Sequence, residues 1–84
     1  MRELVQFLVQ QLVNAPDVVE VKEVRGSTTS IIELRVAKED LGRVIGKQGR
    51  TAHSLRTVLM AAAARTNRRV VLEIIEEKEG VRFR

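Results

Sequence analysis

The sequence contains no cysteine, a single histidine and only two aromatic residues among its 84 positions. Without cysteine there is no disulfide scaffold and no thiolate metal site, and His53 alone excludes a metal site built from several histidines. Because Phe7 and Phe83 are the only aromatic residues, the core has to be built from Val, Leu, Ile and Ala. These absences indicate a small domain with an aliphatic core and modest stability.

Long apolar runs are missing as well. The longest, over residues 58–64, is far too short to span a membrane, and the N-terminus lacks the apolar stretch of a signal peptide. We therefore expect a cytoplasmic protein. A composition of 44% apolar and 31% charged residues is typical of a folded chain rather than a disordered one. We expect one domain over residues 1–78 and a short charged tail over residues 79–84.

Acidic residues are absent from one third of the chain. Residues 41–72 include seven basic residues and no acidic one, whereas residues 1–40 include five basic and seven acidic ones. The seven basic residues are Arg43, Lys47, Arg50, Arg56, Arg65, Arg68 and Arg69. A block of one sign favours a polyanion as the partner, although a solvated basic helix face explains the charge equally well on its own.

The spacing of apolar residues predicts helices over residues 2–14, 40–45 and 50–66, and strands over residues 17–25, 30–37 and 70–75. A slip in the alternation near Val24 suggests a β-bulge, and the charged residues from Glu76 onward are expected to be loosely held. The long helical crossover between the last two strands permits parallel pairing. The predicted fold class is α+β, with the order α-β-β-α-α-β, a three-stranded mixed sheet and three helices on one face.

The segment Gly46-Lys47-Gln48-Gly49 lies between the last two predicted helices. Its glycines allow a sharp turn, and the helix that follows begins with backbone N–H groups that have no partner within the helix. Lys47 and Arg50 add positive charge and Gln48 adds hydrogen-bond donors, so the segment can hold a sugar-phosphate backbone. Alone, such a pattern is more often a glycine-capped turn between helices, but its place in the acid-free block favours binding.

Two other phosphate-binding loops do not fit this segment. A P-loop needs four residues between its glycines and a Ser or Thr after its lysine. Here Gly42 and Gly46 are separated by three residues, and Gln48 follows Lys47. A dinucleotide-binding fingerprint also fails, because the segment has no Gly-x-Gly. A nucleotide-binding role is therefore set aside.

This region resembles KH domains, which bind single-stranded RNA or DNA. Val44-Ile45-Gly46-Lys47-Gln48-Gly49 matches their Val-Ile-Gly-x-x-Gly signature, and the predicted order of elements resembles the type II, prokaryotic arrangement. The longer string over residues 42–52, followed by Leu55-Arg56, looks like the bacterial KhpA family of small stand-alone RNA-binding proteins. The resemblance extends from the first predicted helix to the last predicted strand.

The resemblance implies a non-catalytic protein without a cofactor that binds single-stranded RNA, or single-stranded DNA, as an RNA chaperone or post-transcriptional regulator. Its loop would clamp about four nucleotides by their backbone. The candidate RNA-binding residues are Arg43, Val44, Ile45, Gly46, Lys47, Gln48, Gly49, Arg50, His53 and Arg56. Bases would lie in a groove between the helices and a sheet edge, with Ile32 or Leu34 as further apolar positions. Ala52, where many KH domains have isoleucine, would change the width of that groove.

The resemblance also implies association with other proteins, because members of this family are similar in forming homodimers and in pairing with a larger KH protein of the Jag family. The alternative function is therefore a protein-interaction adapter with little RNA affinity. Such an adapter would dock through an exposed Val71 and Ile75, or through the apolar positions before the loop. No constellation of residues supports a hydrolase or a transferase.

Two features of the basic block stay open. His53 is expected at the surface or at the groove rim, where it would contact phosphate only below about pH 6.5, rather than in a catalytic role. Arg65, Arg68 and Arg69 lie near the end of the last predicted helix, where cations stabilise the helix dipole. These arginines could also serve a longer RNA or a protein partner. Among the carboxylates that follow, Glu73 is expected at a solvated edge.

Overall fold

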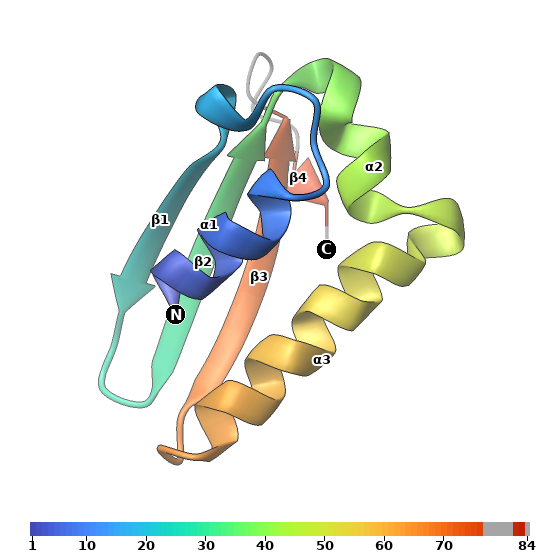
Figure 1. The fold of residues 1–84 in the computed structure, drawn as a ribbon. Coiled ribbons are helices and arrows are strands. Elements are labelled where there is room, and N and C mark those ends of the chain that lie inside the picture. The colour runs from blue at the N-terminus through green and yellow to red at the C-terminus, as the bar shows by residue number, and fades with distance from the viewer. Residues whose placement is uncertain (77–81, 84) are drawn as a thin grey trace.

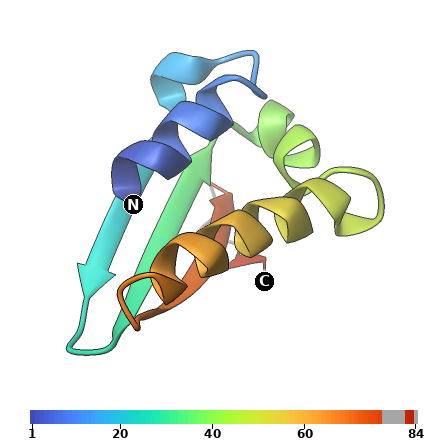
Figure 2. The same ribbon diagram turned by 60° about the horizontal axis from the view of Figure 1, so that its bottom comes forward.

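The computed structural model describes residues 1–76 and 82–83. Three helices cover one face of a sheet with the strand order β1-β2-β3-β4 (Figures 1 and 2). The helices are α1 (Arg2–Gln10), α2 (Leu41–Ile45) and α3 (Arg50–Ala64), and the strands are β1 (Glu20–Arg25), β2 (Thr29–Val36), β3 (Arg69–Glu76) and β4 (Arg82–Phe83). Short 3-10 turns η1 (Pro16–Val18), η2 (Lys38–Asp40) and η3 (Lys47–Gly49) connect them. The predicted α+β class and element order are confirmed.

Strand β2 pairs with a neighbouring strand on each of its two sides. It pairs antiparallel with β1, from Glu20 opposite Arg35 to Arg25 opposite Ser30, and it pairs parallel with β3 along its whole length. Alternate residues of β2 point toward the helices and are buried, as expected for a strand with one covered face. Because β2 and β3 run in the same direction, the chain between them has to cross back over the sheet. Helices α2 and α3 form that crossover.

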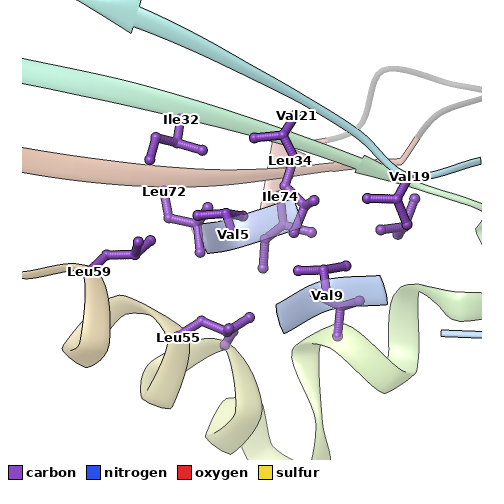
Figure 3. Close-up of a cluster of buried hydrophobic side chains, with 13 residues drawn as sticks. Val5, Val9, Val19, Val21, Ile32, Leu34, Leu55, Leu59, Leu72 and Ile74 are labelled. Atoms are coloured by element: carbon purple, nitrogen blue, oxygen red, sulfur yellow. The ribbon is translucent and has the colours of Figure 1, made fainter. Parts of the chain in front are cut away.

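The core lies between the sheet and the helices, and its side chains are almost entirely aliphatic. Figure 3 shows Val5 and Val9 of α1 facing the sheet, with Leu55 and Leu59 of α3 beside them. The sheet contributes Val21, Ile32, Leu34, Leu72 and Ile74. Among the described residues, no helix combines the length and the apolar character that crossing a membrane requires.

Helix α1 is shorter than the apolar pattern predicts, and a buried carboxylate explains why. The two oxygens of Asp40 accept hydrogen bonds from the backbone N–H groups of Asn14 and Ala15, both at 3.0 Å. These two amides therefore donate to a side chain of η2, and not to the carbonyl oxygens that would accept them in a longer α1. Asp40 itself is only 1% exposed, so the loop after α1 is tied directly to the start of α2.

Much of the apolar stripe predicted for α1 is left at the surface. Only Val5 and Val9 of this helix are buried, whereas Phe7 is 61% exposed and Leu4 is 37% exposed. Leu12, just after the helix, is 38% exposed. The periodicity identified the helix correctly but predicted a wider buried face than the sheet covers.

Two predictions for β1 are wrong. The strand begins at Glu20 instead of Asp17, because Pro16–Val18 forms a 3-10 turn. The predicted bulge near Val24 does not exist, since the register with β2 is continuous from Glu20 to Arg25. Val24 is an apolar residue on the uncovered face of the sheet, where it is 48% exposed. Its apolar character, not an inserted residue, produced the apparent slip in the alternation.

The C-terminal part of the sheet differs from its prediction as well. Ile75 and Glu73, expected to be exposed or at a solvated edge, are 1% and 7% exposed. At this end β3 is not an edge strand, because Ile74 and Ile75 pair with β4. The predicted tail therefore contains a strand at residues 82–83. The predicted domain boundary, between residues 78 and 79, lies outside the described residues.

Arg68 joins the turn between α3 and β3 to the turn between β1 and β2, and both turns lie at the same end of the sheet (Figure 1). Its guanidinium donates hydrogen bonds to the carbonyl oxygens of Ser27 and Gly26, at 3.0 and 2.9 Å, and to Ser30 Oγ at 2.9 Å. The turn before β3 is thereby fastened to the hairpin between β1 and β2. This bonding gives Arg68 a structural role that the helix-dipole interpretation did not predict.

Replacement of Arg68 is expected to destabilise the fold. Arg68→Ala removes three charge-assisted hydrogen bonds, one of them to the buried Ser30, and should lower the free energy of unfolding by about 1–3 kcal/mol. Arg69→Ala, a change of the same type at an exposed neighbour, should change it by less than about 0.5 kcal/mol. Urea unfolding monitored by circular dichroism measures both values, and equal losses in the two variants would contradict the assignment.

Candidate nucleic-acid interface

The loop between α2 and α3 has a backbone conformation that only glycine adopts readily at its first position. Gly46 has φ 77° and ψ 172°, a region that is essentially restricted to glycine. Gln48 and Gly49 follow in the left-handed helical region, with φ of 57° and 75°. This succession turns the chain sharply out of α2 and into α3, and it places Lys47 and Gln48 at the tip, where both are exposed.

Thr51 lies close to the backbone of Gly46, the first residue of the loop. A Cβ atom added at Gly46 would overlap the side-chain hydroxyl of Thr51 and lie 2.8 Å from its backbone nitrogen. Gly46 is therefore required both by its dihedral angles and by this close approach. At Gly49 a Cβ would meet nothing within 4 Å, so only its positive φ matters there. The sequence predicts no role for Thr51, because its close approach to Gly46 becomes visible only in the folded structure.

The start of α3 lies directly after the loop. Gly49 is its N-cap residue, and no side chain caps the helix there. Arg50 begins the helix, is exposed, and donates a long hydrogen bond of 3.4 Å to Gln48 Oε1. The loop thus presents two cations and an amide side chain at the first turn of α3. The backbone N–H groups of Gly49 and Arg50 already donate to the carbonyl oxygens of Gly46 and Lys47.

Three predicted site residues near the loop have contacts with other parts of the fold. Val44 is fully buried in the core, so it holds α2 in place and has no surface for a base. The Nε of Arg43 lies 3.7 Å from Asp40 Oδ1, although its side chain remains 55% exposed. Ile45 is partly buried and packs against the core. Ala52 is also buried, so its substitution for isoleucine affects the core below the loop rather than the open surface.

An apolar groove starts on the other side of α3, between this helix and β3. It has a volume of about 170 Å³ and is lined by Arg56, Leu59, Met60, Val70, Val71 and Leu72. Arg56 spans it, because its guanidinium donates a hydrogen bond of 3.3 Å to the carbonyl oxygen of Leu72. His53 lies one turn before Arg56 on α3 and is exposed, but it is not among the residues that line this groove.

The sheet contributes β3, and not β2, to the groove. Ile32 and Leu34 of β2 have no exposed surface, so the prediction that they contact bases is wrong for this structure. The side chains that replace them are Val71, which is 41% exposed, and Met60 across from it, which is 55% exposed. The sequence predicts an exposed Val71, but as a residue that docks a protein, and it does not single out Met60. The order of the strands decides which strand borders α3. Within the described residues, no three His, Asp or Glu side chains form a group that could hold a metal ion.

A glycine-bounded loop between two helices on one face of such a sheet defines a type II KH domain. A family model described as "KhpA/KhpB, KH domain" matches residues 2–74, and the chain belongs to this family. An RNA-binding protein KhpA from Chlamydia pneumoniae is 50% identical over 78 residues, which cover 93% of this chain and the whole relative. One from Clostridium acetobutylicum is 53% identical over 75 residues, covering 89% of this chain and all of the relative.

A further RNA-binding protein KhpA, from Borreliella burgdorferi, is 47% identical over 74 residues, which cover 88% of this chain and 90% of the relative. No solved structure matches the chain. The resemblance found in the residues around the loop is thereby confirmed over nearly the whole sequence.

The two glycines of the loop are expected to differ in their tolerance of substitution. Gly46→Ala should lower the free energy of unfolding by about 2–4 kcal/mol, since the new Cβ meets Thr51 and the backbone is in a glycine-only region. Gly49→Ala should lower the free energy of unfolding by only about 1 kcal/mol. The added Cβ atom has space there, so only the positive φ is unfavourable. Thermal and urea unfolding of both variants test this order, and equal losses would contradict it.

Proposed function

We propose that the protein binds single-stranded RNA by gripping its sugar-phosphate backbone with the loop Gly46–Gly49, without catalysing a reaction, as a cytoplasmic RNA chaperone or post-transcriptional regulator. The main support is the position of the loop: exposed Lys47 and Gln48 lie beside the start of α3, which has no side-chain cap, and farther along the same helix Arg56, Leu59 and Met60 line an apolar groove. Phosphates would lie at the loop and bases would lie in the groove. The relatives named RNA-binding proteins support the same ligand.

The charge of the neighbourhood supports a polyanion as the ligand. From the start of α2 to Leu72 the chain has no acidic side chain that could repel phosphate. Four basic side chains on or next to the loop and its groove remain for RNA: Lys47, Arg50, Arg56 and, in part, Arg43. If two to four phosphates are neutralised, the logarithm of the affinity should fall with the logarithm of salt concentration with a slope of about −1.4 to −2.8.

The double variant Lys47→Asp/Gln48→Asp tests the loop. It replaces one cation and one amide at the exposed tip by carboxylates, which repel phosphate, and should reduce affinity for a labelled, unstructured RNA of about ten nucleotides at least tenfold. Fluorescence anisotropy at two salt concentrations measures the affinity and its salt dependence.

A matched control makes the same two changes away from the loop. Lys22→Asp/Gln6→Asp alters β1 and α1, and it should leave RNA affinity within about threefold of the wild type. Circular dichroism establishes that all three proteins are folded. Equal affinity of the loop variant and the wild type would overturn the proposal, as would binding that does not depend on salt.

We also propose that the protein associates with a second copy of itself, or with a larger KH protein of the Jag family, through the side of α3 that faces away from the RNA groove. An apolar hollow between α1 and α3 supports this. It is lined by Leu8, Gln11, Leu12, Thr51, Ser54, Leu55 and Val58. Val58 is 45% exposed there, and the exposed Phe7 neighbours Leu8 on α1. An exposed apolar hollow with almost no polar lining can serve as a contact surface for another protein. The docking surface predicted at Ile75 is unavailable, because Ile75 is buried.

Val58→Asp tests this association. A carboxylate in the apolar hollow would have to be desolvated in an interface, so self-association should weaken at least tenfold while the fold is retained. Sedimentation velocity over a range of concentrations measures the effect. The loop variant Lys47→Asp/Gln48→Asp is the control and should associate like the wild type. A wild type that stays monomeric at all concentrations would contradict the proposed self-association.

A further inference from the structure

Thr51 belongs to two features of the molecule at once. It is the second residue of α3, and it lines the apolar hollow between α1 and α3. Its side chain also packs against Gly46, the first residue of the loop, where an added Cβ atom would lie only 2.7 Å from Thr51 Cβ. The side chain of Thr51 therefore fills the space that any other residue would need at position 46.

This contact matters because Gly46 has little conformational preference of its own. Glycine adopts both signs of φ with ease, so neighbouring groups have to fix its φ of 77° and ψ of 172°. Two backbone hydrogen bonds hold it: its N–H donates to the Gly42 oxygen at 2.8 Å, and its own oxygen accepts the Gly49 N–H at 3.1 Å. Thr51 adds a side-chain contact at the same residue. A β-branched side chain has few rotamers on a helix, so this support is rigid.

The shape of Thr51, rather than its hydroxyl, makes the contact. Within residues 1–76 and 82–83 the hydroxyl of Thr51 forms no hydrogen bond. Thr57, on the same helix, differs because its hydroxyl donates to the carbonyl oxygen of His53 at 3.0 Å. A side chain that packs against the loop without a polar partner acts by occupying space.

The hollow that Thr51 lines suits a second copy of this chain. None of its seven lining residues is charged. Two copies, each with a net charge of +4, can therefore meet there without bringing like charges together. Leu4 lies one helical turn before Leu8 on α1 and is 37% exposed, so it extends the apolar surface beyond the hollow.

We propose that Thr51 is the positioning residue of the RNA-binding loop, and that through it a second copy seated in the hollow strengthens RNA binding. The inference rests on the proposed function, which assigns RNA to the loop and a second copy to the hollow. Lys47 and Gln48 follow Gly46 directly, so the backbone angles of Gly46 set the direction in which they point. A copy in the hollow restricts Thr51, and RNA then orders a loop that has already lost part of its freedom.

Three substitutions separate the shape of Thr51 from its hydroxyl. Thr51→Val keeps the shape and should bind a four-nucleotide RNA within about twofold of the wild type, because the lost hydroxyl has no partner. Thr51→Ala removes both γ atoms and should weaken binding about three- to tenfold, since RNA then orders a freer loop. Thr51→Ser keeps the hydroxyl, loses the methyl group and should also weaken binding. Thr57→Ala, the same change at an exposed position of α3, is the matched control and should bind like the wild type.

NMR titration of the nitrogen-15-labelled protein measures these weak affinities from the shifts of the loop amides, and circular dichroism establishes that each variant is folded. Wild-type affinity in Thr51→Ala would overturn the positioning role. Binding that is lost in Thr51→Val and kept in Thr51→Ser would overturn it too, because the hydroxyl would then contact the RNA itself.

The coupling has a readout that a merely structural role of Thr51 would not produce. Coupling between two ligands is reciprocal, so RNA should lower the dissociation constant of the wild-type dimer, by about fivefold. A four-nucleotide RNA isolates this effect, because one loop holds about four nucleotides and so short a strand does not bridge two loops. The same RNA should leave the association of Thr51→Ala unchanged. Sedimentation velocity with and without the RNA measures both dissociation constants.

An association of the wild type that RNA does not change would contradict the coupling, and so would an equal response of Thr51→Ala. Failure of the proposed function has different signatures. If RNA does not bind at the loop, Lys47→Asp/Gln48→Asp retains RNA binding. If the hollow does not hold a second copy, the wild type stays monomeric, or Val58→Asp associates as the wild type does.

Discussion

The parallel pairing of β2 with β3 is the constraint on which the rest of this structure depends. Two neighbouring strands that run in the same direction need a connection that returns across the sheet, and the 32 residues between them are α2, the loop and α3. The return path places the loop at one end of α3 and the start of β3 at the other. It also leaves the edge of β3 beside α3, so the same pairing that completes the core creates the groove.

Two charged side chains hold this arrangement by bonding to backbone groups rather than to each other. Asp40 is buried and accepts two amides of the loop after α1, and Arg68 donates to two carbonyls of the hairpin. Each joins segments that are far apart in the sequence, and each satisfies backbone groups that no helix or strand takes up. The basic block is therefore not uniform. Arg68 is part of the scaffold, Arg43 lies next to Asp40, and Lys47, Arg50 and Arg69 remain at the surface.

The RNA-binding and adapter interpretations concern different sides of one helix. Arg56 and Met60 lie along the side of α3 that faces the groove, whereas Ser54 and Val58 lie along the side that faces α1. Because the two surfaces do not share these side chains, both can be occupied at once. Association would then bring two loops together, which raises the effective concentration of a second binding site for a longer RNA. RNA binding by one domain and association of two domains are therefore compatible.

The sequence by itself determined the local features: the order of helices and strands, the loop with its required glycines, and the family to which the chain belongs. Each of these depends on neighbouring residues, whose periodicity and spacing are visible in one dimension. Tertiary structure decided what depends on distant residues. It shortened α1 through Asp40, buried Val44, Ile32 and Leu34, fastened Arg68 to the hairpin, and made β3 the wall of the groove. Exposure and hydrogen bonding at these positions depend on which elements pack side by side, and no local pattern specifies that.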